Sequence, residues 1–182
     1  MDNFTKPRST TARRIRLVAF DVDGVLTDGR LYYSETGDAM KAFDVRDGMG
    51  MKLLQDAGIT LAIITSRRAP SVLLRARDLG IHHVQQGVAD KRIGFDALLT
   101  ELAIAPEEAA FMGDDLVDLP VFRRCGFAVT VADAPALLKR HADFVTRATG
   151  GHGAVREFSE MLLHSRGMLA AQTRRFLDAT PH

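Results

Sequence analysis

The sequence predicts an α/β fold in three layers, a Rossmann-like parallel sheet with helices on both faces. Short apolar runs alternate with segments of helical period along most of the chain. Gly58, Gly80 and Gly126 come just after helical segments, where a left-handed residue often ends a helix. Strands that alternate with helices of this length pair in parallel, because each helix returns the chain across the sheet.

The apolar runs predict buried strands because they are short and end in turn residues. The predicted strands are 15–20, 60–65, 82–87, 109–114, 127–132 and 142–146. The predicted helices are 48–57, 69–79, 92–102, 116–124, 135–140 and 154–164. Residues 30–45 break the alternation, since β-type residues flank the turn sequence "SETGD". This pattern predicts a β-hairpin after the first strand.

The chain has 182 residues, of which 46% are hydrophobic, which is enough for one domain with a real core. We place this domain at residues 15–165. The polar N-terminal arm, residues 1–14, is expected to be flexible. The C-terminal tail, residues 166–182, could be helical, frayed or docked elsewhere.

Composition narrows the class of partner and the compartment. The net charge of +1 provides no basic field, so neither a nucleic acid nor a membrane is an expected partner. The single cysteine, Cys125, excludes an internal disulfide framework and fits a reducing compartment. No stretch approaches the roughly 20 apolar residues that span a bilayer, and the first residues lack the apolar segment of a secretory signal. We therefore expect a cytoplasmic protein.

Polar side chains follow three of the predicted strands. They are Asp21, Asp23, Thr65, Ser66, Asp114 and Asp115. In parallel sheets ligands bind beyond the carboxyl ends of the strands, so these side chains are expected to converge. Asp21 and Asp23 can point the same way, and their repulsion favours a cation between them. Oxygen ligands without a His or Cys cluster suit Mg²⁺.

This combination of groups suits phosphoryl transfer. A carboxylate beside a metal can attack phosphorus, and a second carboxylate can donate and accept the proton. The transferring group also needs donors and positive charge around it. Thr65 and Ser66 supply hydroxyl groups, and Lys91 supplies a cation at the start of a predicted helix.

The stretches "DVDGVLTDG", "IITSR", "VADKRIG" and "MGDDLVD" resemble the four motifs of the haloacid dehalogenase superfamily, in order, over residues 17–119. The resemblance implies that Asp21 is the nucleophile and Asp23 the general acid and base, which favours a phosphatase or phosphotransferase over a dehalogenase. It implies Mg²⁺ held by Asp21, the Asp23 carbonyl and Asp114. Thr65 and Lys91 would bind the phosphoryl oxygens. Asp115 would lie behind the metal ligands. Asp118, four positions after Asp114, is also expected behind them and could cap or orient rather than bind metal.

The superfamily resemblance also indicates that no cap domain covers the site. Only "GVAD" separates the third predicted strand from Lys91, and the other usual insertion point holds just the hairpin. An uncovered site takes a large substrate or is covered by a neighbouring subunit, because phosphoryl transfer benefits from excluding water.

Together with "FDVRDGMG" and "GGHGAVRE", the motifs resemble the 3-deoxy-D-manno-octulosonate 8-phosphate phosphatase family over residues 15–163. This resemblance implies hydrolysis of that sugar acid phosphate through an aspartyl-phosphate, a step toward lipopolysaccharide. It also implies a homotetramer whose hairpins associate, so that a neighbour's hairpin and tail line each site. The expected substrate contacts are Asp23, Asp44, Val45, Arg46, Asp47, Gly48, Lys52, Ser66, Arg67, Arg75 and Lys91.

The sequence leaves several alternatives open. Thr65 and Ser66 could cap the following helix, and Lys91 could be a solvated lysine at a helix start. Lys52 and Arg75 could be solvated helix positions. The sequence "GGHG" is more typical of a flexible loop than of a site, so no catalytic role is expected for His152. At the level of function, the alternatives are a phosphatase for a related nine-carbon sugar acid 9-phosphate and a non-catalytic interaction module of the same fold.

Overall fold

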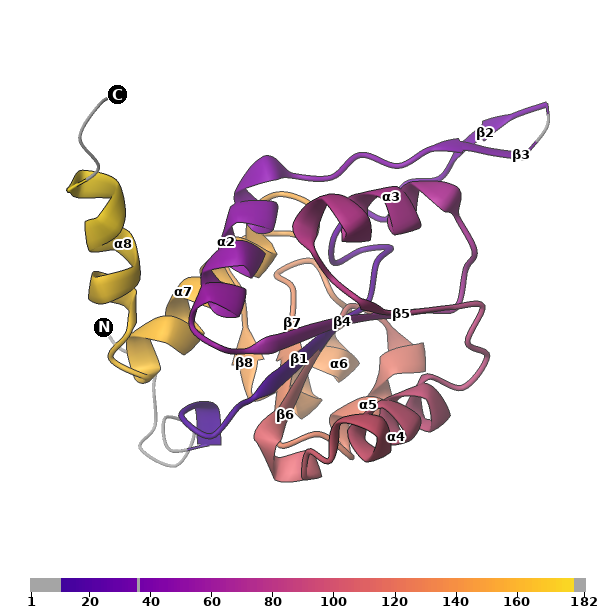
Figure 1. Ribbon diagram of the computed structural model, residues 1–182. Helices are drawn as coiled ribbons and strands as arrows, with labels where there is room; N and C mark the ends of the chain where they lie inside the picture. Colours follow the sequence, from indigo (N-terminus) through magenta and orange to yellow (C-terminus); the bar gives the residue numbers. More distant parts are fainter. Residues whose placement is uncertain (1–10, 36, 179–182) are drawn as a thin grey trace.

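The computed structural model describes residues 11–35 and 37–178, and its centre is a six-stranded sheet (Figure 1). The strand order is β5-β4-β1-β6-β7-β8, and every neighbouring pair is parallel. The strands are β1 (Leu17–Phe20), β4 (Thr60–Thr65), β5 (His83–Gln86), β6 (Ala109–Gly113), β7 (Phe127–Thr130) and β8 (Phe144–Val145). The predicted parallel sheet is therefore confirmed.

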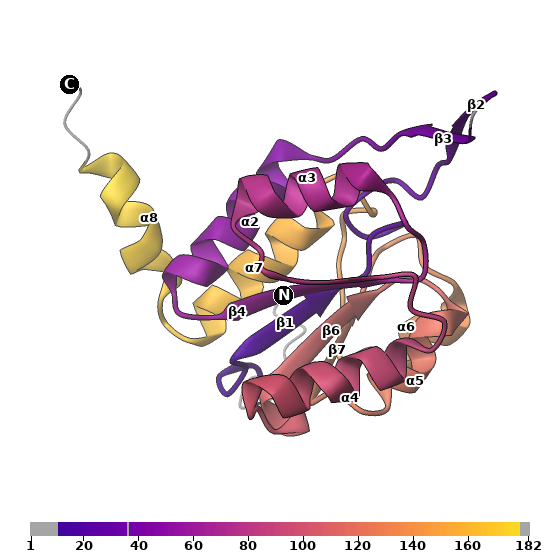
Figure 2. The ribbon, with the colours of Figure 1, turned by 45° about the vertical axis from the view of Figure 1, so that its right-hand side comes forward.

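Helices cover both faces of this sheet. Figures 1 and 2 show α2, α3 and α7 on one face and α4, α5 and α6 on the other. Their bounds are α2 (Val45–Asp56), α3 (Pro70–Leu79), α4 (Lys91–Leu102), α5 (Leu119–Phe122), α6 (Ala136–His141) and α7 (Ala154–Ser165). The prediction of a three-layer α/β fold is confirmed.

The core lies between the sheet and each helical layer. All four residues of β1 are buried, because the strand has a neighbour on each side and helices above and below. On one face Phe111 packs edge-on against Phe95 of α4, with ring centroids 6.0 Å apart. On the other face Phe127 stacks on Phe158 of α7 at 6.4 Å. This two-sided burial explains why the strands are continuous apolar runs.

The predicted hairpin is present between β1 and α2. Its strands, β2 (Tyr32–Ser34) and β3 (Gly37–Met40), pair antiparallel as a separate two-stranded sheet. Both views show it projecting away from the domain (Figures 1 and 2). Its side chains Tyr33 and Met40 are exposed. Within the described residues, the chain between β1 and α2 forms this hairpin and no cap domain.

Two predicted helices differ from the observed bounds by more than one residue at an end. Helix α2 begins at Val45 rather than 48, because the Asp44 carboxylate accepts a hydrogen bond from the Arg46 amide at 2.6 Å and caps the helix. The predicted helix 116–124 is a 3₁₀ turn, Leu116–Asp118, followed by the short α5. Pro120 has no amide hydrogen to donate and is placed in the first turn of α5, which accounts for the new start.

Two of the three glycines behave as expected. Gly58 and Gly80 have φ of +78° and +69°, whereas Gly126 is absent from the positive-φ residues of the described chain. Gly126 was expected to end a helix in the left-handed conformation, and this prediction was wrong. A Cβ at this position would overlap the Glu107 backbone, so close approach of two chain segments explains the glycine.

The two ends of the chain extend beyond the predicted domain. Residues 1–10 of the expected flexible arm lie outside the described residues, but Ala12 is buried in the core. The tail forms helix α8 (Leu169–Leu177), which lies apart from the sheet in both views and pairs Arg175 with Asp56 of α2. In the part of the chain that the structure describes, no helix has the length and apolar character needed to cross a membrane.

Candidate active site

The carboxyl ends of three adjacent strands bring the predicted catalytic residues together. Asp21 follows β1, Thr65 ends β4, and Asp114 follows β6. Because β1 pairs with β4 on one side and β6 on the other, these ends lie side by side. The Asp21 amide donates to the Met112 carbonyl at 2.9 Å, which extends the β1–β6 pairing to the catalytic position.

Lys91 is the cation at the bottom of the site. Its Nζ lies 2.6 Å from Asp21 Oδ2 and 2.7 Å from Asp118 Oδ1. The Lys91 side chain is only 3% exposed, so the alternative of a solvated lysine is wrong. Burial alone would lower the pKa of Lys91, but Asp21 and Asp118 outweigh it and raise the pKa above its usual value. Lys91 is therefore a fixed positive charge.

Asp118 orients the loop that follows β6. One of its oxygens accepts hydrogen bonds from the amides of Asp114 and Asp115, at 3.0 and 3.2 Å, while the other contacts Lys91. The residue is fully buried. A side chain with both oxygens engaged in this way holds its neighbours in place. Asp115 itself is exposed and accepts from the Leu116 amide at 2.7 Å, so it caps the 3₁₀ turn.

The carboxylates of this cluster fit a divalent cation. Oxygen atoms of Asp21, Asp114 and Asp118 lie within 4.8 Å of one another. Burial, together with the charges of Asp21 and Asp118, raises the pKa of Asp114 to about 8. Burial likewise raises the pKa of Asp21 to about 6, although Lys91 opposes it. The carboxylates thus carry more negative charge than Lys91 compensates, and an all-oxygen donor set of this kind suits Mg²⁺.

The loop after β1 leaves room for Asp114 to approach. Gly24 has φ of +87°, and a Cβ there would overlap the Asp114 carboxylate. The Gly150–Gly151 turn then packs on this loop, since the Gly151 amide donates to Val25 at 3.0 Å and a Cβ on Gly150 would overlap Gly24. The expectation of a flexible "GGHG" loop was wrong. Its glycines permit close packing beneath the site.

Asp23 lies at the outer side of the site, between two cations. Lys41 Nζ forms an ion pair with Asp23 Oδ1, and Arg67 Nε lies 3.8 Å from Oδ2. Arg67 Nη2 also donates to the Tyr33 hydroxyl of the hairpin at 3.1 Å. Our sequence analysis missed Lys41, because it belongs to no motif and its contact depends on the path of the hairpin. The sequence signal that could have identified Lys41 is its position directly after the hairpin.

Thr65 and Ser66 differ in burial. Thr65 is buried, and its Oγ1 accepts from the Arg67 amide at 3.4 Å. Ser66 is exposed beside it. Helix α3 begins only at Pro70, with Ala69 at its N-cap, so the alternative of a helix cap is wrong for both.

The start of α2 forms a rim that is partly exposed. Asp44 and Arg46 pair through two oxygens, with the shortest contact at 2.7 Å. Hydrogen bonds from Arg46 lower the pKa of Asp44 below its usual range. Val45 is 78% exposed between them. Lys52 is also exposed, but it lies roughly two turns farther along α2.

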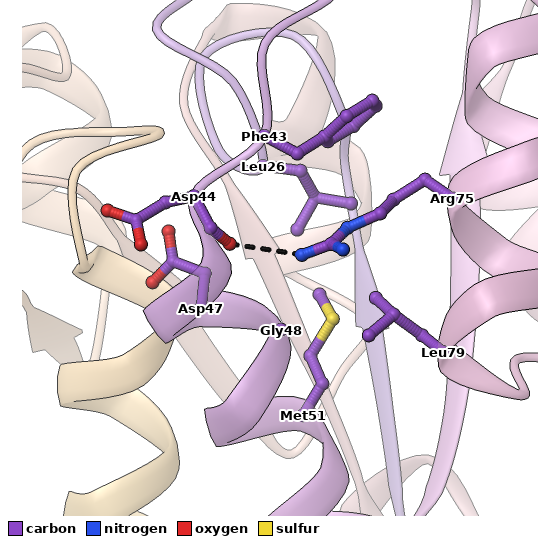
Figure 3. Close-up of a pocket in the computed structure, with 8 residues that line it drawn as sticks. All are labelled: Leu26, Phe43, Asp44, Asp47, Gly48, Met51, Arg75 and Leu79. Carbon is purple, nitrogen blue, oxygen red and sulfur yellow. Dashed lines mark hydrogen bonds between the residues drawn. The ribbon is translucent and has the colours of Figure 1, made fainter.

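Arg75 of α3 contacts the backbone at this rim (Figure 3). Its Nη2 donates to the Asp44 carbonyl at 3.1 Å, and its guanidinium lies 5.8 Å from the centre of the Phe43 ring. A Cβ on Gly48 would overlap the same guanidinium. Within this chain Arg75 therefore holds the start of α2, and it is not a simply solvated helix position.

Asp47, also at the start of α2, binds the N-terminus of α7. Its oxygens accept from the amides of Gly153 at 3.2 Å and Arg156 at 2.8 Å, which caps the N-terminus of α7. The residue is buried, and burial raises its pKa. Both carboxylate oxygens of Asp47 thus bind backbone amides, and the substrate contact expected from Asp47 stays a prediction.

A parallel sheet of this order with paired aspartates after its central strand is typical of one class of hydrolase, and residues 82–158 match the haloacid dehalogenase-like hydrolases. The chain is 51% identical over 158 residues to the 3-deoxy-D-manno-octulosonate 8-phosphate phosphatase KdsC of Escherichia coli, covering 87% of this chain and 84% of that protein. It thus belongs to the 3-deoxy-D-manno-octulosonate 8-phosphate phosphatase family.

Solved structures agree with this assignment. The phosphatase of that name from Yersinia pestis superposes with a TM-score of 0.89 and 44% identity, over 92% of this chain and 90% of the other. The Moraxella catarrhalis phosphatase, in complex with magnesium ion, phosphate ion and KDO, has a TM-score of 0.92 and 39% identity, over 95% and 99% of the two chains. Both resemblances seen in the sequence are confirmed.

Proposed function

We propose that this protein hydrolyses 3-deoxy-D-manno-octulosonate 8-phosphate to the free sugar acid and phosphate, in the formation of lipopolysaccharide. The observation that carries the proposal is Asp21, held by Lys91 and facing Asp114 at the carboxyl edge of the sheet. The activity is that of the curated relatives, and the Moraxella catarrhalis structure holds the sugar acid, phosphate and magnesium together.

The reaction proceeds in two steps on Asp21. An Asp21 oxygen attacks phosphorus, the bond from phosphorus to the sugar oxygen breaks, and Asp23 gives its proton to that oxygen. Water then attacks the aspartyl-phosphate, Asp23 takes the proton, and phosphate leaves. The Val22 amide donates to Asp21 Oδ1 at 2.7 Å, and Lys91 holds Oδ2, so the nucleophile has little freedom to rotate.

The residues around the phosphoryl group share the remaining work. Lys91 and Thr65 bind its oxygens, and Ser66 offers a second hydroxyl group. Asp21, Asp114 and the Asp23 carbonyl hold Mg²⁺. When bound, the ion offsets the negative charge of the carboxylates and the phosphoryl oxygens. Asp118 keeps Asp114 in place, and Asp115 caps the turn behind it.

We assign recognition of the sugar acid to the rim at the start of α2 and to the segment after β4. The substrate carries a carboxylate in addition to its phosphate, and a guanidinium can fork onto such groups. We assign this contact to Arg46 and Arg67, whose side chains are 66% and 39% exposed, together with Asp44 and Val45. Arg75 and Gly48 act by fixing the rim. Lys52 contributes only if the substrate or a neighbouring subunit reaches along α2.

We further propose a homotetramer in the cytoplasm. The hairpin exposes Tyr32, Tyr33 and Met40, and α8 exposes Phe176 and Leu177, which supports burial of both elements against other subunits. Association of hairpins would bring a neighbour over the site and exclude water. The single cysteine is consistent with a reducing compartment.

A substrate panel tests the proposed function. Phosphate release is measured with 3-deoxy-D-manno-octulosonate 8-phosphate, with nine-carbon sugar acid 9-phosphates and with simple sugar phosphates, in Mg²⁺ and then with a chelator. The highest kcat/KM is expected for the eight-carbon substrate, with activity lost on chelation. A nine-carbon preference would change the assigned substrate, whereas no turnover on any member would indicate a non-catalytic module.

A further inference from the structure

Asp23 is held by two cations that come from different parts of the chain. Lys41 contacts Oδ1 from the segment after the hairpin, and Arg67 Nε lies 3.8 Å from Oδ2 from the segment after β4. Rotation of the carboxylate out of its present plane would weaken both contacts. The orientation of Asp23 is therefore set by residues outside its own loop.

The contact with Lys41 is the stronger of the two. The Lys41 side chain is only 4% exposed, whereas that of Arg67 is 39% exposed and its nearest approach to Asp23 is longer. A sheltered ion pair is less weakened by solvent and salt than an exposed one. Asp23 Oδ1 is thus firmly occupied, and Oδ2 is the oxygen that is more weakly held.

Lys41 also connects this contact to the hairpin. It follows directly after Met40, the last residue of β3. On the paired strand β2, the Tyr33 hydroxyl accepts from Arg67 Nη2 at 3.1 Å. Both strands of the hairpin are therefore linked to a cation that contacts Asp23.

We propose that Lys41 is a positioning residue for proton transfer by Asp23. By occupying Oδ1, it leaves Oδ2 to carry the proton toward the oxygen that departs from phosphorus. Lys41 itself forms and breaks no bond. The inference rests on the proposed function only in taking Asp23 as the proton carrier, and it adds a residue that lies outside the four motifs.

The proposal predicts a dependence on the leaving group. A sugar oxygen departs as a poor leaving group and needs the proton, whereas 4-nitrophenolate departs readily without it. Misplacing Asp23 should therefore slow the first step for a sugar phosphate far more than for 4-nitrophenyl phosphate. The parameter to compare is kcat/KM, because it covers only the steps up to release of the alcohol and omits the later attack by water.

The experiment compares Lys41→Met with Lys41→Arg on both substrates in saturating Mg²⁺. For Lys41→Met we expect kcat/KM to fall roughly 30-fold or more with the sugar acid phosphate and less than about threefold with 4-nitrophenyl phosphate. Lys41→Arg, which keeps a cation, should recover most of the loss. Arg30→Met is the matched control, since Arg30 lies before the hairpin, 78% exposed, and pairs with Asp28. It should change both values less than about twofold.

Equal losses on the two substrates would overturn the proposal, because a general disturbance of folding or assembly affects both alike. No loss on either substrate would overturn it as well. Thermal unfolding of each variant identifies a folding defect independently. If the wild-type protein fails to hydrolyse the eight-carbon substrate, the proposed function fails, and the same comparison is made with the best alkyl phosphate of the panel.

Discussion

Two groups of charged and polar side chains surround the proposed site, and they differ in burial and in the elements that hold them. The inner cluster, defined as Asp21, Lys91, Asp114 and Asp118, lies at the strand ends and is largely buried. The outer cluster, defined as Asp23, Lys41, Arg67 and Tyr33, is partly exposed and depends on the hairpin. The inner cluster is thus fixed by the sheet, whereas the outer one can respond to whatever binds the hairpin.

Removing the cation of the inner cluster should have the largest effect. Lys91→Met leaves two buried carboxylates uncompensated, so we expect a fall in kcat/KM on the order of a thousandfold and a loss of roughly 3 kcal/mol in the free energy of unfolding. Steady-state kinetics and urea unfolding measure the two quantities. Arg16→Met is the control, because it removes a cation that pairs with Glu108 at the opposite edge of the sheet, just before β1 and β6. If Lys91→Met retained activity within tenfold, Lys91 would not be the phosphoryl-binding cation.

Metal and pH should act together on the inner cluster. The pKa of Asp114 is raised to about 8 and that of Asp21 to about 6, both from 3.8, so the metal-free folded protein binds protons that the unfolded chain releases. Its stability should therefore fall as pH rises from about 5 to about 8. Mg²⁺ relieves the repulsion, so the gap in Tm between Mg²⁺ and chelator should widen over the same range. A gap independent of pH would contradict this electrostatic account.

A smaller effect is expected at Asp47, and it tests whether this residue contributes to stability or to substrate binding. Asp47→Ala removes the cap of α7, and we expect the free energy of unfolding to fall by about 1–2 kcal/mol, with KM for the substrate nearly unchanged. Chemical unfolding and steady-state kinetics on the same preparation separate the two effects. A large rise in KM at unchanged stability would indicate instead that Asp47 contacts the substrate.

The inner cluster could be predicted from the sequence, and the outer one only in part. Apolar runs ending in Asp21, Thr65 and Asp114 predict where parallel strands end, and ordered motifs identify Lys91. Lys41 could not be found in this way, since its contact with Asp23 depends on how the hairpin leaves the sheet.

The roles of the two aspartates at the start of α2 could not be predicted from the sequence either. Asp44 and Asp47 are three positions apart in one acidic stretch, and the pattern does not show which of them faces the substrate. In the structure Asp44 caps α2, whereas Asp47 caps α7 across a helix interface. A tertiary contact of this kind leaves no local signal in the sequence.

The central claim is that Asp21 becomes phosphorylated, and rapid quenching tests it most directly. Protein mixed with substrate labelled on its phosphate is stopped in acid within one turnover, and the label on the chain is located by proteolysis and mass spectrometry. We expect a transient label on the peptide containing Asp21 in the wild type and in Lys41→Met, and none in Asp21→Asn. Turnover without any label on the chain, or an Asp21→Asn variant with wild-type kcat, would contradict the account.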